Sequence, residues 1–211
     1  MSRTQYHIHS RAYLGRAFSR LSEQTTEGLF YAAFELRCGI EARIDEYATA
    51  NKYVSQKKAK GWRVAPKFKE LERVRTANVR TAYVGIMPPG ETATKDLYFT
   101  PVNSDVRNYA KRLGDFLHAQ TTLPDAVQLR AWLETIAHEL RIACSGTLLV
   151  PPLMKNENPP EIEMNVEFRT ESEAREWHAS IKDFENITVR VEYLDSPPEN
   201  YLRLMDEMLS S

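Results

Sequence analysis

Hydrophobic residues recur at helical spacing through the first fifty residues of the chain. The clearest pattern follows Thr25 and Thr26, because either hydroxyl can accept hydrogen bonds from the free N–H groups of a first helical turn. The repeating residues are Leu29, Ala33, Leu36, Ile40, Ile44 and Tyr47. Their spacing of three or four predicts one buried stripe over about five helical turns. A shorter amphipathic pattern predicts a helix before it, from about Arg11 to Ser22.

Three later segments also have helical patterns. Residues 67–74 follow Pro66 and predict a short helix. The next helix begins at Ser104 or Asp105, both good capping residues, and continues to about His118. The last long helix begins at Asp125 and ends near Gly146. We therefore expect a mainly α protein whose residues 1–150 form a four-to-five-helix bundle.

Two β-prone runs interrupt this helical region. Residues 81–86 and 95–100 are rich in aromatic and β-branched side chains and flank Pro88, Pro89 and Gly90. This arrangement predicts a β-hairpin near 81–100, inserted into the bundle. An ordered loop is the alternative.

The C-terminal part has a different pattern. Residues 151–160 contain four prolines and predict a linker. Apolar and polar residues then alternate from Glu161 to Phe168, which predicts a half-buried strand. A helix over 172–184, a strand over 188–193 and a closing helix complete a small β-α-β-α module over 161–211. Because such a module is too small to be stable alone, we expect it to pack on the bundle or on a partner.

The composition is that of a globular protein, with 42% hydrophobic and 27% charged residues among 211. No apolar run is long enough to cross a membrane, and the N-terminus lacks the apolar stretch of a secretory signal. The two cysteines, Cys38 and Cys144, are too few for a disulfide framework. We therefore expect a cytoplasmic protein with no membrane contact.

Charge is unevenly distributed along the chain. Residues 52–80 hold ten basic residues against two acids, a net charge of +8, whereas residues 151–211 hold fourteen acids against six bases, a net charge of −8. A basic segment of this kind can contact phosphates. The alternative is that both segments are solvated surfaces that face each other.

Most motifs for known chemistries are missing. The chain has no glycine-rich phosphate loop of either common type, no Gly-x-Ser-x-Gly turn and no His-Glu-x-x-His pair. Neither Cys38 nor Cys144 has a second cysteine near it in the sequence. We therefore expect neither a metal ion nor a cofactor.

One group of residues does suggest chemistry. Arg112, Asp115 and His118 follow one another at three-residue steps on a predicted helix, where residues three apart are neighbours. Arg112 and His118 lie about 120° apart around an ideal helix. They converge on one ligand if the helix unwinds near His118 or if a second copy faces it, and Asp115 can orient either side chain. An exposed ladder of ion pairs at a helix end is the alternative interpretation.

The stretch Phe34–Glu41, reading FELRCGIE, followed later by Arg112-x5-His118 resembles the HEPN superfamily. These are helical-bundle proteins of prokaryotic defence and toxin–antitoxin systems, and the resemblance covers about residues 11–148. The chain differs from many members in having Leu113 directly after the arginine. It also has Leu117 where some toxin members have a tyrosine that a partner nucleotidyltransferase modifies, which argues against that antitoxin arrangement.

The resemblance implies an HEPN-like bundle that works as a metal-independent endoribonuclease. His118 would serve as general acid or base and Arg112 would hold the scissile phosphate, leaving a 2′,3′-cyclic phosphate. It also implies a homodimer through the motif helix and an antitoxin or defence-system partner protein. The basic segment would then bind the RNA backbone. Its candidate RNA-binding residues are Lys57, Lys58, Lys60, Arg63 and Lys67.

Two other functions remain open at this point. Many HEPN-like bundles are non-catalytic modules for protein interaction or ligand binding, and Leu113 and the acidic C-terminal module fit such a role. The third possibility is a purely structural helical protein in which the match to the motif is accidental.

Overall fold

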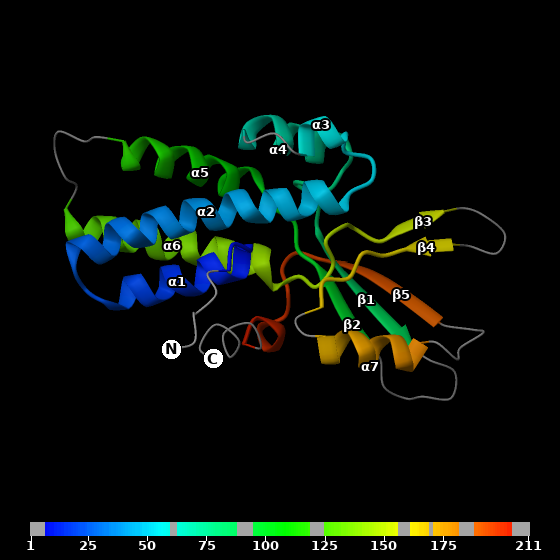
Figure 1. The fold of residues 1–211 in the computed structure, drawn as a ribbon. Helices are drawn as coiled ribbons and strands as arrows, with labels where there is room; N and C mark the ends of the chain where they lie inside the picture. The colour runs from blue at the N-terminus through cyan, green and yellow to red at the C-terminus, as the bar shows by residue number, and fades with distance from the viewer. Residues whose placement is uncertain are drawn as a thin grey trace.

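The computed structural model describes residues 7–59, 63–87, 95–118, 125–155, 161–168, 171–181 and 188–203. The protein is mainly helical with a small antiparallel sheet (Figure 1), which confirms the predicted mainly α class. The elements are α1 (Ser10–Ser22), α2 (Thr26–Ala50), α3 (Gln56–Ala59), α4 (Val64–Arg73), β1 (Thr81–Met87), β2 (Lys95–Phe99), α5 (Ser104–Leu117), α6 (Ala126–Ser145), β3 (Leu153–Lys155), β4 (Glu161–Glu163), α7 (Glu171–Ile181) and β5 (Thr188–Leu194).

Helix α2 is the central element of a four-helix bundle. It packs against α1, α5 and α6, and α4 lies across α2 and the first half of α5 (Figure 1). The predicted stripe of α2, from Leu29 to Tyr47, is fully or almost fully buried. Gly39 lets α1 and α6 approach, because a Cβ there would lie 2.9 Å from Leu140 Cδ2 and 3.2 Å from Tyr13 Cβ.

Side-chain caps fix where the bundle helices begin. The Thr25 hydroxyl accepts a hydrogen bond from the Gly28 N–H at 2.9 Å, as predicted, and Asp125 caps α6. Helix α5 is capped by Asn103, whose Oδ1 accepts from the Val106 N–H at 2.9 Å. The prediction of Ser104 or Asp105 as this cap is therefore wrong by one or two residues. Three good capping residues follow one another here, and local propensity does not choose among them.

The predicted hairpin forms, but it is not a separate insertion. Strand β1 pairs antiparallel with β2, with Val84 opposite Leu97, and also with β5, with Val84 opposite Val191. The hairpin and the C-terminal segment thus share one sheet of order β2-β1-β5. A two-stranded hairpin is marginally stable in water, and β5 satisfies the second edge of β1.

The segment between the bundle and β5 also differs from its prediction. Strand β3 lies within the predicted linker, and β4 ends at Glu163 instead of continuing to Phe168. After β4 the chain pairs with the residues that follow α6, because the Leu149 N–H donates to Asn165 O and the Glu167 N–H to Thr147 O. The alternating residues are therefore in extended backbone as predicted, but they form two short pairings, one with β3 and one with residues 147–149, and not a single strand.

Two buried arginines join this segment to the bundle. Arg43 Nε donates to Ala143 O and Nη2 to Gly146 O, each at 3.0 Å, and Arg11 donates to Cys144 O and Gly146 O. Both guanidinium groups also pair with Glu167, at 3.0 and 3.1 Å. The last carbonyls of a helix have no partner within it, so the arginines satisfy the end of α6 and complement its dipole. Arg43 is not one of the six residues of the predicted α2 stripe, yet it is fully buried.

Candidate functional site

Helix α5 carries the predicted catalytic residues. Val106, Ala110, Leu113 and Phe116 are buried against the bundle, and Arg112, Asp115 and His118 are all exposed. The amphipathic pattern of α5 therefore presents the three polar side chains to solvent.

Arg112 lies on the side of α5 that faces α6. Its Cζ is 5.0 Å from the centre of the Trp132 ring, and Trp132 in turn meets the Phe116 ring edge-on. A guanidinium over an indole face is held by a cation–π attraction. Within the described part of the chain no carboxylate pairs with Arg112, so its donors are not committed to an acid.

His118 is the C-cap residue of α5. Its N–H still donates to Gly114 O at 3.3 Å and its φ of −72° is helical, while its ψ of 155° is extended. The angle φ, and not ψ, sets the direction of the Cα–Cβ bond relative to the preceding helix. Because φ of His118 is helical, its imidazole points as it would from a continued helix. The separation of about 120° from Arg112 therefore persists at the helix end.

A different arginine lies on the His118 side of α5. The Arg37 guanidinium of α2 lies against Gly114, where a Cβ would be 3.4 Å from both Cζ and Nη1. Gly114 is four residues before His118, one turn along the same side of the helix. Arg37 Nε also donates to Glu41 at 3.1 Å.

Two exposed aromatic residues lie on α2 near this arginine. Tyr31 is 58% exposed and Phe34 is 50% exposed. Their neighbour Phe30 stacks on Phe116 with ring centres 4.9 Å apart, which brings this part of α2 to the last turn of α5. Sequence reasoning did not select Tyr31, Phe34 or Arg37 as site residues. The available signal was that they lie off the buried stripe of α2.

The predicted RNA-binding residues lie elsewhere. Lys57 is exposed on α3, and Arg63 is exposed just before α4. Arg107 Cζ lies 5.0 Å from the Phe68 ring, so α4 meets the first half of α5 and not the end with His118. The side chain of Lys58 and the whole of Lys60 lie outside the described residues.

Lys67 does not fit its predicted role. It is 3% exposed, and its ammonium pairs with Asp45 of α2. A phosphate cannot reach a buried ammonium that already has a carboxylate partner, so Lys67 instead holds α4 on α2. The sequence did not reveal this, because the spacing of α4 alone does not say which lysine faces inward.

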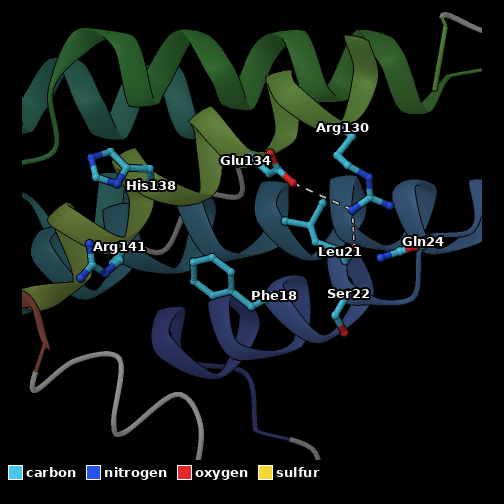
Figure 2. Close-up of a pocket in the computed structure, with 8 residues that line it drawn as sticks. All are labelled: Phe18, Leu21, Ser22, Gln24, Arg130, Glu134, His138 and Arg141. Carbon is cyan, nitrogen blue, oxygen red and sulfur yellow. Dashed lines mark hydrogen bonds and ion pairs between the residues drawn. The ribbon is translucent and has the colours of Figure 1, made fainter. Parts of the chain in front are cut away.

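A cavity of about 580 Å³ opens between α1 and α6 (Figure 2). Arg130 at one end donates to the Leu21 carbonyl and lies 3.9 Å from Glu134, and His138 and Arg141 lie at the other end beyond Phe18. Arg130 of α6 caps the end of α1, so we interpret the residues around this cavity first as a structural contact between the two helices. It is lined by no residue of α5.

A second hollow contains Cys38, His7 and His9 beside Glu41, Asp45 and Glu46. Burial, together with the Glu41 and Glu35 carboxylates, raises the pKa of the Cys38 thiol to about 11. A nucleophilic cysteine needs the opposite shift. His9 Nδ1 accepts from the Ala12 N–H at 3.2 Å, so His9 caps α1. In the described ranges, no three His, Cys, Asp or Glu side chains are grouped so that they could hold a metal ion.

Comparison of the chain with protein-family models, curated proteins and solved structures gives no match. Among the helices described, none is both long and apolar enough to cross a bilayer.

Proposed function

We propose that the protein is a metal-independent endoribonuclease of HEPN type that acts in the cytoplasm through Arg112 and His118. The observation that supports this most directly is that both side chains are exposed on α5, with the guanidinium held over Trp132. A ribonuclease needs few groups, because RNA carries its own nucleophile in the 2′-hydroxyl.

The reaction assigns one role to each side chain. His118 takes the proton of the 2′-hydroxyl, whose oxygen then attacks the adjacent phosphorus. The bond from phosphorus to the 5′-oxygen breaks, and that oxygen leaves as a hydroxyl after taking a proton from the imidazolium of His118, which returns to its neutral form. The products are a 2′,3′-cyclic phosphate and a 5′-hydroxyl end. Arg112 donates two hydrogen bonds to the non-bridging oxygens and offsets their growing negative charge.

Two copies of the chain complete the site in this proposal. Arg112 and His118 point about 120° apart from one helix, so one phosphate cannot easily meet both. A two-fold axis at α5 places Arg112 of one copy near His118 of the other. Asp115, exposed between them, orients either group. The resemblance further favours a defence or toxin–antitoxin setting with a partner protein that restrains the activity.

The first test is cleavage of a mixed RNA pool in EDTA by the wild type, His118→Ala, Arg112→Ala and the control His138→Ala. His138 is an exposed histidine on α6, away from α5. We expect cyclic phosphate ends from the wild type and the control, and a loss of about 100-fold or more in the other two variants. Equal cleavage by His118→Ala, with circular dichroism showing intact folding, would place the activity elsewhere.

A second test asks whether the two groups come from different copies. Arg112→Ala and His118→Ala are unfolded together, refolded as a mixture and assayed. Random pairing gives half mixed dimers with one intact site each, so about a quarter of wild-type activity should return. No recovery would mean that both groups act within one chain.

The alternative function is a non-catalytic module that binds a protein or a ligand. Its specific support is Leu113 after Arg112 and the exposed pair Tyr31 and Phe34. If no RNA is cut and no variant at Arg112 or His118 changes any measured property, this function is the better one.

A further inference from the structure

Helices α2 and α5 meet where Arg37 lies against Gly114 and Phe30 stacks on Phe116. Phe34 is one turn after Phe30 and His118 one turn after Gly114, and we call the strip formed by Phe34, Arg37, Gly114 and His118 the α2–α5 seam. We propose that this seam binds single-stranded RNA, with one base stacked on Phe34 and one phosphate held by Arg37, beside His118 of the same chain. The inference rests on the proposed ribonuclease function and replaces the basic segment as the main RNA-binding surface.

Arg37 is placed to serve His118 within one chain. Arg112 lies on the α6 side of α5, over Trp132, whereas Arg37 lies on the opposite side against Gly114. His118 leaves the helix one turn beyond Gly114 on that second side. Arg37 is therefore the arginine that shares a side of α5 with His118.

The Arg37 guanidinium is also in a suitable state to bind an anion. Glu41 accepts only from Nε, and the described residues offer its two terminal nitrogens no hydrogen-bond partner. Its side chain is 36% exposed, so a phosphate can reach those nitrogens. The position of the guanidinium beside Gly114, together with its bond to Glu41, restricts the side chain, which lowers the entropy lost on binding.

Phe34 and Tyr31 provide aromatic faces next to Arg37. Residues three apart on a helix are neighbours, so Tyr31, Phe34 and Arg37 form a continuous row on α2. Arg20 of α1 lies with its Cζ 5.2 Å from the Tyr31 ring, which adds a cation at the outer end of the row. Aromatic rings beside cations are the common elements of single-strand binding surfaces.

The aromatic row favours a single strand over a duplex. A base must be unpaired before it can stack on a side chain, and double-stranded RNA is recognised through its backbone instead. The predicted basic segment is less suitable, because Lys67 is buried and α4 meets the other half of α5.

Binding is measured first, without cleavage. The probe is a short fluorescent single-stranded RNA with 2′-fluoro riboses, which lack the attacking hydroxyl. We expect Phe34→Ala to weaken binding about tenfold. We expect Arg37→Ala to weaken binding and lower the slope of log affinity against log salt by about 0.7. Phe34→Trp should bind as the wild type does.

Matched controls come from surfaces away from the seam. Tyr193 of β5 is 56% exposed, and Arg175 is exposed on α7, so Tyr193→Ala and Arg175→Ala remove an exposed aromatic ring and an exposed arginine. Unchanged binding by Phe34→Ala and Arg37→Ala, or equal losses in the controls, would overturn the proposal. Equal affinity for a duplex of the same sequence, equally sensitive to Phe34→Ala, would overturn the stacking. Conversion of a dimer to a monomer by Phe34→Ala in sedimentation would instead identify the seam as a contact between copies.

Cleavage then distinguishes this inference from the proposed function. If the wild type binds the probe through the seam but cuts no RNA, the ribonuclease proposal fails and the seam remains an RNA-binding surface. If RNA is cut, a refolded mixture of Arg37→Ala and His118→Ala should give only the mean of the two parent activities. Recovery above that mean would place Arg37 and His118 in different copies and overturn the assignment to one chain.

Discussion

Among the described residues, Arg43 is the largest side chain that is fully buried. It donates to two carbonyls at the end of α6 and pairs with Glu46 and Glu167. A buried charge is stable only when its hydrogen-bonding groups are matched, and removing the charge takes one donor from each of its partners.

Substitution of Arg43 should therefore be severe. We expect Arg43→Met to lower the free energy of unfolding by about 3–5 kcal/mol, because two carbonyls and two carboxylates each lose one of their donors. Urea denaturation measures this. The control Arg37→Met removes an arginine from the surface of the same helix and should change stability by about 0.5 kcal/mol or less. Equal losses for the two variants would show that the buried network contributes little.

His9 gives the protein a pH-dependent helix cap. Burial lowers the pKa of His9 below its ordinary value, against the opposing effect of Glu46 and Glu167, and His7 and Arg11 lower it further. The neutral form is also the one whose Nδ1 can accept from Ala12. The folded state therefore binds the proton less readily than the unfolded chain.

This shift has a definite sign. Where the unfolded state binds more protons, stability rises with pH, so the contribution of His9 is complete above about pH 6.5 and is lost below it. We expect His9→Asn, which keeps a capping side chain, to flatten the fall in stability on acidification. Urea denaturation across this pH range tests it, with His138→Asn as control. A wild-type fall that is unchanged in His9→Asn would contradict the assignment.

At the scale of elements, Gly146 and Gly114 lie where two elements pack closely against each other. Gly146 ends α6 with a φ of −63°, so its role is not a left-handed turn. A Cβ there would lie 2.5 Å from Thr100 Oγ1 and 2.8 Å from Thr100 N. Gly114 in α5 has more space, because its Cβ would lie 3.4 Å from the Arg37 guanidinium.

Alanine at these two glycines should have opposite effects. We expect Gly146→Ala to cost about 1–3 kcal/mol, since backbone must move to admit the methyl group. Gly114→Ala should be neutral or stabilise by up to about 1 kcal/mol, since alanine favours the helix. Thermal or urea unfolding of both variants gives the comparison. A stable Gly146→Ala protein would mean that the end of α6 can move away from Thr100, the residue after β2, at little cost.

At the scale of the whole molecule, the C-terminal segment joins the same sheet and the same buried ion-pair network as the helical region. Strand β5 covers one edge of β1 along its length, and Glu167 pairs with both buried arginines. Tyr201 and Leu202 are buried as well, and the Tyr201 hydroxyl donates to Thr147 Oγ1 at 3.3 Å.

Deletion of residues 151–211 should therefore abolish the stable fold. It exposes the edge of β1 and leaves Arg11 and Arg43 without Glu167. We expect insoluble protein or loss of cooperative unfolding, whereas Tyr193→Ala, an exposed substitution in the same segment, should behave as the wild type. A soluble, cooperatively unfolding truncated protein would restore the idea of a separate module.

The sequence by itself determined the longer helices of the bundle and most of their buried faces, although it did not predict α3. The stripe on α2, the caps at Thr25 and Asp125 and the hairpin were all readable, because periodicity and capping depend on residues close together in the chain. The same local information also marked Arg112, Asp115 and His118 as a group of neighbours on one helix.

Only the tertiary structure decided which distant groups meet. The pairing of β5 with β1, the burial of Arg43 and Lys67 and the contact of Arg37 with Gly114 join residues far apart in sequence. The sequence pattern of a strand does not say which other strand it pairs with. The burial of a charged residue can be predicted only when the groups that pair with its charge are known. For this reason the sequence identified the helix that carries Arg112 and His118, and the packing of α2 and α6 on that helix decided which groups lie on each side of it.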